Sequence, residues 1–357
     1  MSEKSENLSL HQQFISRKND HIHLSLDPEN EASGLTGLDQ VQLLHDSLPD
    51  LNLNEVSIET SFLDRPLATP FFISGMTAGH ENAQKINLTL GALAANRGWL
   101  MGVGSQRREL ENKNYSDASI FELSKRYSSL KLIANFGIAQ VIEANQNGTL
   151  ARINEIANQM NAVLIAIHLN PLQEAIQAEG TPNFKGSWDA LQKLSEISSI
   201  PIIVKETGSG MSEVALEKLS RLKLFAVDVS GLGGTHWGRI EGKRASANSV
   251  SSVMGGTFKN WGISTVESVL HAEQTLRSPT EVWASGGVRS GLDAAKLIAL
   301  GAKRIGFAKP ALAAALAGEK SLELWMQIIE QELKVALFCT NTKDVGSLNS
   351  NSLRGVF

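Results

Sequence analysis

The sequence predicts an α/β fold, a (β/α)8 TIM barrel with an N-terminal extension and a C-terminal helix. From residue 67 onward, short apolar runs of strand length recur, and most are followed by an amphipathic stretch. Continuous apolar strands that alternate with helices indicate a parallel sheet covered on both faces. We count eight such runs. Their span of roughly 250 residues matches a closed barrel better than the alternative, an open doubly wound sheet.

The predicted strands follow one another without an internal repeat. They cover residues 67–74, 99–104, 130–135, 163–169, 201–205, 224–230, 281–285 and 304–307. The connection from 231 to about 264 is rich in Gly, Ser, Asn and Arg and has little apolar periodicity. This composition predicts a long functional loop. Apolar residues at helical spacing over 319–338 predict the C-terminal helix.

Three segments follow from this pattern. Residues 1–65 are predicted to form a polar, loop-rich extension that contributes to the active site. Residues 66–340 form the ligand-binding barrel, and residues 341–357 form a loose polar tail.

Composition narrows the function classes. The formal net charge is −4 and the basic residues are scattered, which leaves no patch for nucleic acid or an anionic membrane. No apolar run approaches the roughly 20 residues that cross a bilayer. The single cysteine, Cys339, excludes an intrachain disulfide. The first ten residues are mostly polar and lack the apolar core of a signal peptide, so we expect a cytoplasmic enzyme with a small ligand.

Glycine pairs at the last two strand ends predict a phosphate site. In barrel enzymes the functional groups follow the strands, and the loops after strands seven and eight often bind phosphate. Here strand seven ends in Gly286-Gly287 with Arg289 beside it, and strand eight runs through Gly306 to Lys309. Glycine is also the usual residue of tight turns. Two such loops beside a cation favour a bound phosphate.

Lys205 ends an otherwise apolar strand, so its ammonium needs a counter-charge or a polar cofactor. A salt bridge to Glu206 or Asp228 is one explanation. Strand alternation argues against Glu206 and lets Lys205 face the barrel mouth. There the ammonium is suited to the N1–C2 edge of a reduced flavin. The absence of a dinucleotide fingerprint favours FMN over FAD.

The loop after strand four offers His168, Asn170 and Glu174, which suit a diphosphate bound with Mg²⁺. Glu174 by itself is more typical of a solvated helix start, because acidic side chains favour first turns. Arg17, Lys18 and Arg107 are each explained as surface charges, or together as a diphosphate clamp if the N-terminal segment folds back over the mouth.

Taken in order, these motifs resemble type-II isopentenyl-diphosphate isomerases along nearly the whole chain. The shared segments are Arg-Lys-x-x-His, Gly-Met-Thr, Gly-Ser-Gln-Arg, His-Leu-Asn-x-x-Gln-Glu, Ser-Gly-x-Gly-Gly-Thr and Gly-Gly-Val-Arg. One departure is Ala78, which stands where that family usually has a second glycine.

The resemblance implies interconversion of isopentenyl and dimethylallyl diphosphate, with reduced FMN as acid/base, Mg²⁺, and NADPH or NADH as reductant. It further implies a homo-oligomer, a tetramer or an octamer. The implied FMN contacts are Met76, Thr77, Ala78, Ser105, Asn135, Lys205, Ser230, Thr235, Gly287, Val288, Arg289, Ala308 and Lys309. The implied substrate contacts are Arg17, Lys18, His21, Ser105, Gln106, Arg107, His168, Asn170 and Gln173. Glu174 is the implied Mg²⁺ ligand.

Gln173 and Glu241 are the candidates for proton relay or positioning, and Glu241 is equally explained as a loop surface carboxylate. Three alternatives stay open. An FMN-dependent oxidoreductase of the 2-hydroxy-acid oxidase type shares the fold, but strand seven ends in Ser285-Gly286-Gly287 without its usual histidine. A nucleotide dehydrogenase needs a cysteine in the sixth loop, and Cys339 lies elsewhere. A flavin-binding protein without turnover has no need of the substrate residues.

Overall fold

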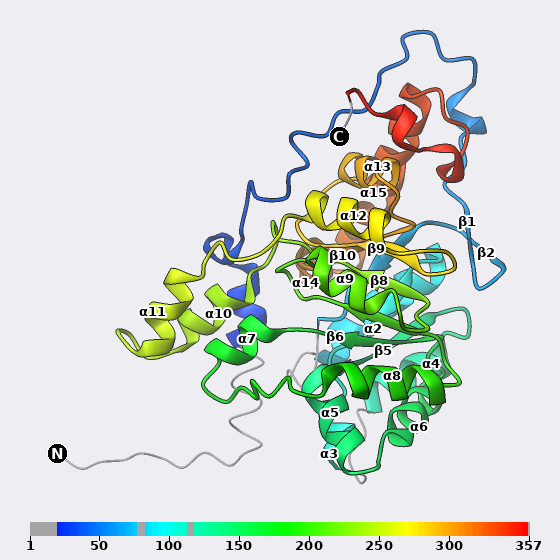
Figure 1. Ribbon diagram of the computed structural model, residues 1–357. Helices are drawn as coiled ribbons and strands as arrows, with labels where there is room; N and C mark the ends of the chain where they lie inside the picture. Colours follow the sequence, from blue (N-terminus) through cyan, green and yellow to red (C-terminus); the bar gives the residue numbers. More distant parts are fainter. Residues whose placement is uncertain (1–19, 77–82, 113–117, 356–357) are drawn as a thin grey trace.

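A closed barrel of eight parallel strands forms the centre of the molecule in the computed structural model (Figure 1). The structure describes residues 20–76, 83–112 and 118–355. The barrel closes where β10 pairs with β3, with Ile305 opposite Phe71, so the open-sheet alternative is wrong. The strands are β3 (Phe71–Ile73), β4 (Leu100–Gly102), β5 (Lys131–Gly137), β6 (Leu164–His168), β7 (Ile202–Lys205), β8 (Ala226–Asp228), β9 (Glu281–Ala284) and β10 (Arg304–Phe307).

Helices surround the barrel. They are α2 (Ala83–Arg97), α3 (Arg107–Glu111), α4 (Ala118–Arg126), α5 (Ile138–Gln146), α6 (Ala151–Gln159), α7 (Pro171–Ile176), α8 (Ser187–Ile197), α9 (Glu213–Leu219), α10 (Trp237–Arg244), α11 (Val250–Thr257), α12 (Thr265–Thr275), α13 (Gly291–Ala299), α14 (Lys309–Ala317) and α15 (Glu319–Cys339). The predicted C-terminal helix is α15, which packs against α2, α13 and α14. Within the described ranges, no helix is both long and apolar enough to cross a membrane.

Strand alternation divides the core into two layers. Phe72 points into the barrel, while its neighbours Phe71 and Ile73 point outward against the helices. Inside the barrel, Phe72 stacks on Trp283 with ring centroids 5.0 Å apart. These rings belong to a buried apolar cluster inside the barrel, and a cavity with room for a ligand lies at the C-terminal ends of the strands.

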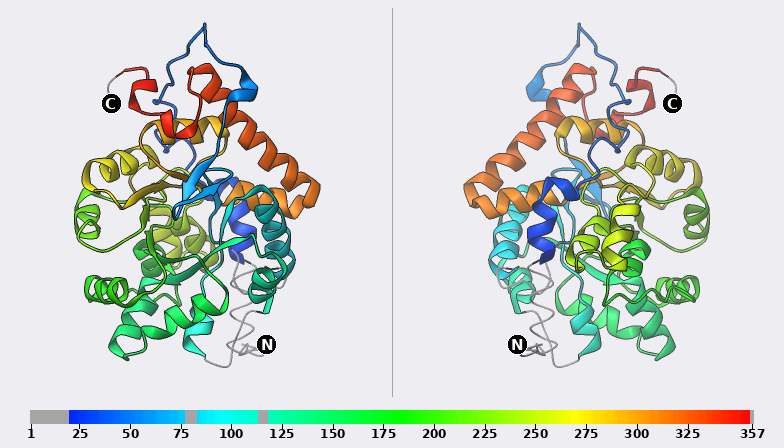
Figure 2. Two further views of the ribbon diagram at one scale, coloured as in Figure 1. Left: turned by 90° about the vertical axis from the view of Figure 1, so that its right-hand side faces the viewer. Right: turned by 90° about the vertical axis from the view of Figure 1, so that its left-hand side faces the viewer.

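The end of the barrel opposite the mouth is covered by a hairpin that the sequence did not predict (Figure 2, left). It consists of β1 (Thr60–Phe62) and β2 (Arg65–Leu67), paired antiparallel. The first predicted strand, 67–74, was therefore too long: Leu67 belongs to β2, and the barrel strand starts at Phe71. The apolar run continues across both elements, so periodicity alone could not separate them.

The predicted long loop 231–264 also needs correction, because it contains α10 and α11. These two helices pack with their backbones in close approach: a Cβ on Gly242 would lie 2.7 Å from the Cα of Gly255. Glycines thus make the contact that apolar side chains usually make, which is why the segment lacks apolar periodicity. Together with a helical stretch over residues 20–26, the pair lies in front of the barrel mouth (Figure 2, right).

The tail after α15 is structured over the described residues, contrary to the expected loose tail. It contains two 3-10 turns, η3 (Val345–Ser347) and η4 (Ser350–Ser352). Bridges join Leu353 to Leu43 and Asp344 to Ser57. The extension itself carries two such turns, η1 (Pro28–Asn30) and η2 (Leu53–Glu55). Residues 43 and 57 of the extension therefore pack against the described part of the C-terminal tail.

Candidate active site

A cavity of about 240 Å³ opens at the C-terminal ends of the barrel strands. Its walls come from the strand-end loops and from the N-terminal segment, which supplies His21 and Glu31. Most of the predicted site residues converge there. They are His21, Met76, Ser105, Arg107, Asn135, His168, Asn170, Gln173, Glu174, Lys205, Ser230, Thr235, Gly287, Val288, Arg289, Ala308 and Lys309.

Lys205 and Asp228 form a buried charge pair beside this cavity. The Lys205 Nζ lies 3.9 Å from the Asp228 Oδ2, and Ser285 donates its hydroxyl to the same carboxylate at 2.9 Å. Burial raises the pKa of Asp228, against the lowering effects of Lys205 and Ser285. The Asp228 pairing considered from the sequence is therefore present, and Lys205 still lines the cavity.

The Glu206 carboxylate turns away from Lys205, as strand alternation indicated. It accepts the backbone N–H groups of Thr207, Gly208 and Ser209 at 2.5–2.7 Å. Burial raises the pKa of Glu206 to about 7, although these three hydrogen bonds and the charge of Lys205 lower it. Glu206 thus organises the loop after β7. The Lys205 ammonium instead donates to the Glu206 carbonyl oxygen at 2.5 Å.

The residues after β3 and β9 and at the start of α14 suit a flavin with its phosphate. The Ser74 hydroxyl lines the cavity and is buried without a hydrogen-bond partner among the described residues, which suits a polar ligand edge. Gly286 and Gly287 have positive φ values of 99° and 73°. A Cβ on Gly286 would lie 2.1 Å from the Gly231 oxygen. The backbones of the loops after β8 and β9 therefore approach each other closely. Lys309, the first residue of α14, also lines the cavity, and a helix N-terminus stabilises an anion.

A second polar cluster joins the N-terminal segment to α7 and α10. Glu241 Oε1 lies 2.9 Å from His21 Nε2 and accepts from Gln173 Nε2 at 3.0 Å. Its other oxygen accepts from Arg244 at 2.5 Å. Burial by itself would raise the pKa of Glu241, but His21, Arg244 and Gln173 lower it to about 2. Glu241 is therefore a buried, ionised carboxylate, and the surface alternative is wrong.

Glu174 lies on α7 at the cavity edge, beside this cluster. Its carboxylate accepts from Asn170 Nδ2 at 3.0 Å and from the Thr181 backbone N–H at 2.6 Å. Across residues 20–76, 83–112 and 118–355, no three His, Cys, Asp or Glu side chains group closely enough to hold a metal. A hard divalent ion at Glu174 would take its other oxygen ligands from a bound diphosphate and water.

Comparison with known proteins identifies the family. The model of the FMN-dependent dehydrogenase family matches residues 117–355. Over 345 residues, the chain is 46% identical to the isopentenyl-diphosphate delta-isomerase of Bdellovibrio bacteriovorus, covering 96% of this chain and 98% of the relative. The enzyme of the same name from Synechococcus is 39% identical, with coverages of 93% and 94%. The chain belongs to the isopentenyl-diphosphate delta-isomerase family.

Solved structures of flavin oxidoreductases share the fold of this chain at low sequence identity. A mutant flavocytochrome b2 with benzoylformate has a TM-score of 0.68 and is 16% identical, covering 97% of this chain and 84% of that chain. A mandelate oxidase mutant with (S)-mandelic acid has a TM-score of 0.65 and 15% identity, with both coverages at 97%. At such low identity the likeness is one of fold. The delta-isomerase family, not the oxidase type, is the one to which the full chain belongs.

Some residues that the family resemblance marked lie elsewhere. Arg17, Lys18, Thr77 and Ala78 fall outside the described residues. Gln106 is buried away from the cavity lining, where its amide contacts Met160 Sδ and accepts from the Asn135 backbone N–H. Their ligand contacts stay predictions, as do the individual roles of the residues that line the cavity.

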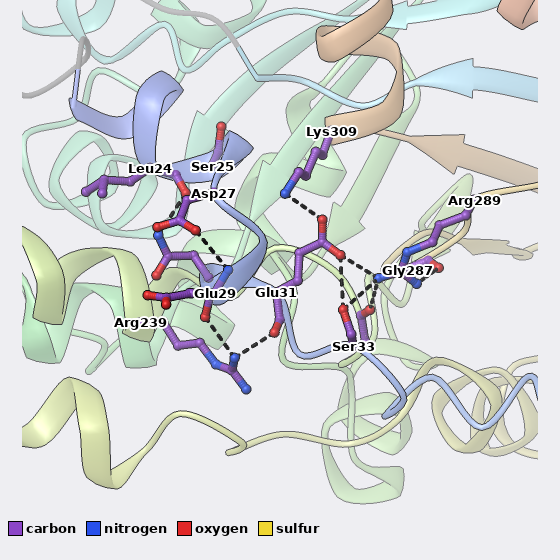
Figure 3. Close-up of polar contacts among 12 residues, drawn as sticks. Leu24, Ser25, Asp27, Glu29, Glu31, Ser33, Arg239, Gly287, Arg289 and Lys309 are labelled. Atoms are coloured by element: carbon purple, nitrogen blue, oxygen red, sulfur yellow. Dashed lines mark hydrogen bonds and ion pairs between the residues drawn. The ribbon is translucent and has the colours of Figure 1, made fainter.

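Besides Ser74, sequence reasoning missed two charged contributors to this delta-isomerase site. Glu31 lies between Arg289 and Lys309 (Figure 3), and Arg244 pairs with Glu241. Glu31 occurs in a loop-rich segment with no motif, so no local signal marks it. The Arg244 contact has one signal: it lies three residues after Glu241, a spacing that brings side chains together on a helix.

Proposed function

We propose that this protein interconverts isopentenyl and dimethylallyl diphosphate with FMN bound in the barrel mouth. One observation carries the proposal. A single cavity is lined both by the Lys205 ammonium with the Gly286-Gly287 pair and by His21 and Gln173, whose shared partner is the buried carboxylate of Glu241. The first set suits a redox cofactor, and the second suits a reaction in which protons move.

The residues that would hold FMN are Lys205, Ser74, the Gly286-Gly287 pair and Lys309. When bound and reduced, FMN supplies the acid/base group at the alkene. Lys205 places a positive charge in a sheltered part of the cavity, where its interaction with an anionic ring is stronger than in water. Asp228 lies 3.9 Å from that ammonium and helps to fix its position.

The polar cluster around Glu241 holds a proton at His21 Nε2. Glu241 stays ionised and lies 2.9 Å from that nitrogen, which stabilises the protonated ring. Gln173 donates to the same oxygen and lines the cavity. We infer that this arrangement orients Gln173 and His21 toward the reacting carbons. One proton is added at one carbon and one is removed from another, so the reaction has no net gain or loss of protons.

The diphosphate would lie near Arg107, His168 and Asn170, with Mg²⁺ at Glu174. Asn170 holds Glu174 through its amide, so the carboxylate is oriented before the ion arrives. Its charge suits a hard divalent cation that keeps part of its water shell.

Further parts of the proposal rest on the family resemblance. They are NADPH or NADH as the source of reduced flavin, and a homo-oligomeric tetramer or octamer. A cytoplasmic location is a separate part of the proposal. We propose no nucleic acid or membrane partner.

The decisive experiment separates catalysis from net redox chemistry. The flavin is reduced once with dithionite under anaerobic conditions, and isopentenyl diphosphate and Mg²⁺ are added in deuterated water. We expect many turnovers per flavin and deuterium in the dimethylallyl product, because substrate and product are isomers. Nicotinamide oxidised mole for mole with product would instead establish an oxidoreductase.

A further inference from the structure

Glu31 occupies the position between the two cations that are expected to hold the cofactor phosphate (Figure 3). Arg289 Nη2 donates to Glu31 Oε2 at 2.7 Å. Lys309 Nζ lies 2.6 Å from Oε1 in an ion pair. Each carboxylate oxygen of Glu31 therefore pairs with one of the two cations. A carboxylate of the protein itself thus occupies the proposed phosphate site.

The backbone fixes this carboxylate in place. Glu31 forms an antiparallel bridge with Thr235, in the loop after β8. Arg239 Nη1, at the start of α10, donates to the carbonyl oxygens of Glu29 at 3.0 Å and Glu31 at 2.6 Å. A ligand at the cations can displace the Glu31 side chain by rotating it, but it cannot easily move the segment.

The Glu31 carboxylate is ionised at neutral pH. Its side chain is 15% exposed. Burial raises the pKa of Glu31, but the hydrogen bonds and charges of Lys309 and Arg289 outweigh burial, and the pKa lies below its usual value. A full negative charge is thus present at the site before any ligand arrives.

We propose that Glu31 competes with the 5′-phosphate of FMN and thereby sets how strongly the protein prefers FMN over riboflavin. A phosphate monoester carries about −1.5 to −2 charges at pH 7. Two cations cannot neutralise both this charge and a carboxylate in a partly sheltered site. Riboflavin has the same ring but no phosphate, so Glu31 has little effect on it. The inference rests on the proposed FMN site.

Flavin titrations of the flavin-free protein test the proposal. Dissociation constants for FMN and riboflavin are measured by quenching of flavin fluorescence in the wild type and in Glu31→Gln. We expect the variant to bind FMN roughly tenfold more tightly or better, because one unit of repulsion is removed at partial exposure. Riboflavin affinity should change by less than about twofold, since it makes no phosphate contact.

Glu29→Gln is the matched control. It removes the same charge from the same segment, but Glu29 pairs with Lys243 at 2.7 Å and its side chain is 80% exposed. Its FMN affinity should match the wild type. Glu31→Asp, which withdraws the carboxylate by one methylene, should give an intermediate FMN affinity and serves if Glu31→Gln unfolds.

The outcomes separate this inference from the proposed function. Weaker FMN binding by Glu31→Gln would mean that Glu31 holds the cations in place for the phosphate, and it overturns the inference. So does an equal change for both flavins, or no change for either. If neither form binds FMN, the proposed function and the inference fail together.

Discussion

The two ends of the barrel treat buried polar groups differently. At the closed end, Arg304 is 1% exposed, and its guanidinium donates to Thr60 Oγ1, the Lys303 carbonyl oxygen and the Ser61 carbonyl oxygen. It also lies over the Phe62 ring. At the mouth, Lys205 and Ser74 line an open cavity, and Ser74 lacks a hydrogen-bond partner among the described residues.

The difference between the two ends indicates that polar groups at the closed end contribute to stability, whereas polar groups at the mouth bind a ligand. At the closed end the two Nη atoms of Arg304 donate to β1 and to the Lys303 carbonyl, although its Nε has no hydrogen-bond partner among the described residues. Arg304 does not line the cavity, so changes there should alter folding. Polar groups at the mouth converge on a cavity, so changes there should alter chemistry. The predictions below test this division from the largest expected effect to the smallest.

Glu241→Gln should give the largest loss at the mouth. The neutral amide no longer stabilises a proton on His21, so kcat should fall about 10²- to 10³-fold, the range of general acid/base effects. Steady-state kinetics with saturating FMN and Mg²⁺ measures this. Glu179→Gln is the control, because Glu179 pairs with the same Arg244 at 2.9 Å but is 41% exposed. Equal losses in the two variants would assign the effect to Arg244 packing.

Arg304→Met should act on stability alone. The buried Arg304 guanidinium donates to the Ser61 and Lys303 carbonyl oxygens and to Thr60, and these charge-assisted hydrogen bonds are lost, so the free energy of unfolding should fall by about 2–3 kcal/mol. Denaturant unfolding measures the loss, and kcat/KM below the transition should stay unchanged. Lys303→Met, an exposed neighbour on the same edge, should be close to neutral. A drop in kcat/KM for the folded Arg304 variant would break the proposed division.

Arg244→Gln should change the pH dependence of activity. The wild-type pKa of Glu241 is about 2, so its carboxylate stays ionised over the working pH range. Its negative charge is lost only as the pH falls through that value. Removing the arginine charge should raise this pKa by roughly 1 to 3 units. The acid limb of kcat/KM should therefore move to higher pH. Arg244→Lys keeps the charge and should restore much of the wild-type profile, whereas superimposable profiles for all three proteins would exclude the charge effect.

Glu174→Gln should have the smallest effect of this series. An amide is a poorer ligand for a hard cation, so the Mg²⁺ concentration for half-maximal activity should rise by about tenfold while the flavin stays bound. Activity is measured against Mg²⁺ concentration, and the visible spectrum reports flavin. An unchanged Mg²⁺ response would leave Glu174 with only its contacts to Asn170 and Thr181.

The sequence by itself determined the barrel and most of the cavity lining. Buried parallel strands read as continuous apolar runs, so the eight strands could be located to within a few residues. Because parallel strands present their C-terminal ends at one face, the residues after them, such as Asn135, His168 and Lys205, had to converge. Both signals are local and depend on few residues.

Only the tertiary structure decided the contacts between distant segments. His21 meets Glu241 across 220 positions, and Glu31 meets Arg289 across 258. Such ion pairs leave no periodic trace, since a single charged residue in a polar segment looks the same whether it is solvated or paired. The α10–α11 contact was hidden for a related reason: Gly242 and Gly255 pack by having no side chain, so the hydrophobic pattern that reveals a helix is absent where the helices meet.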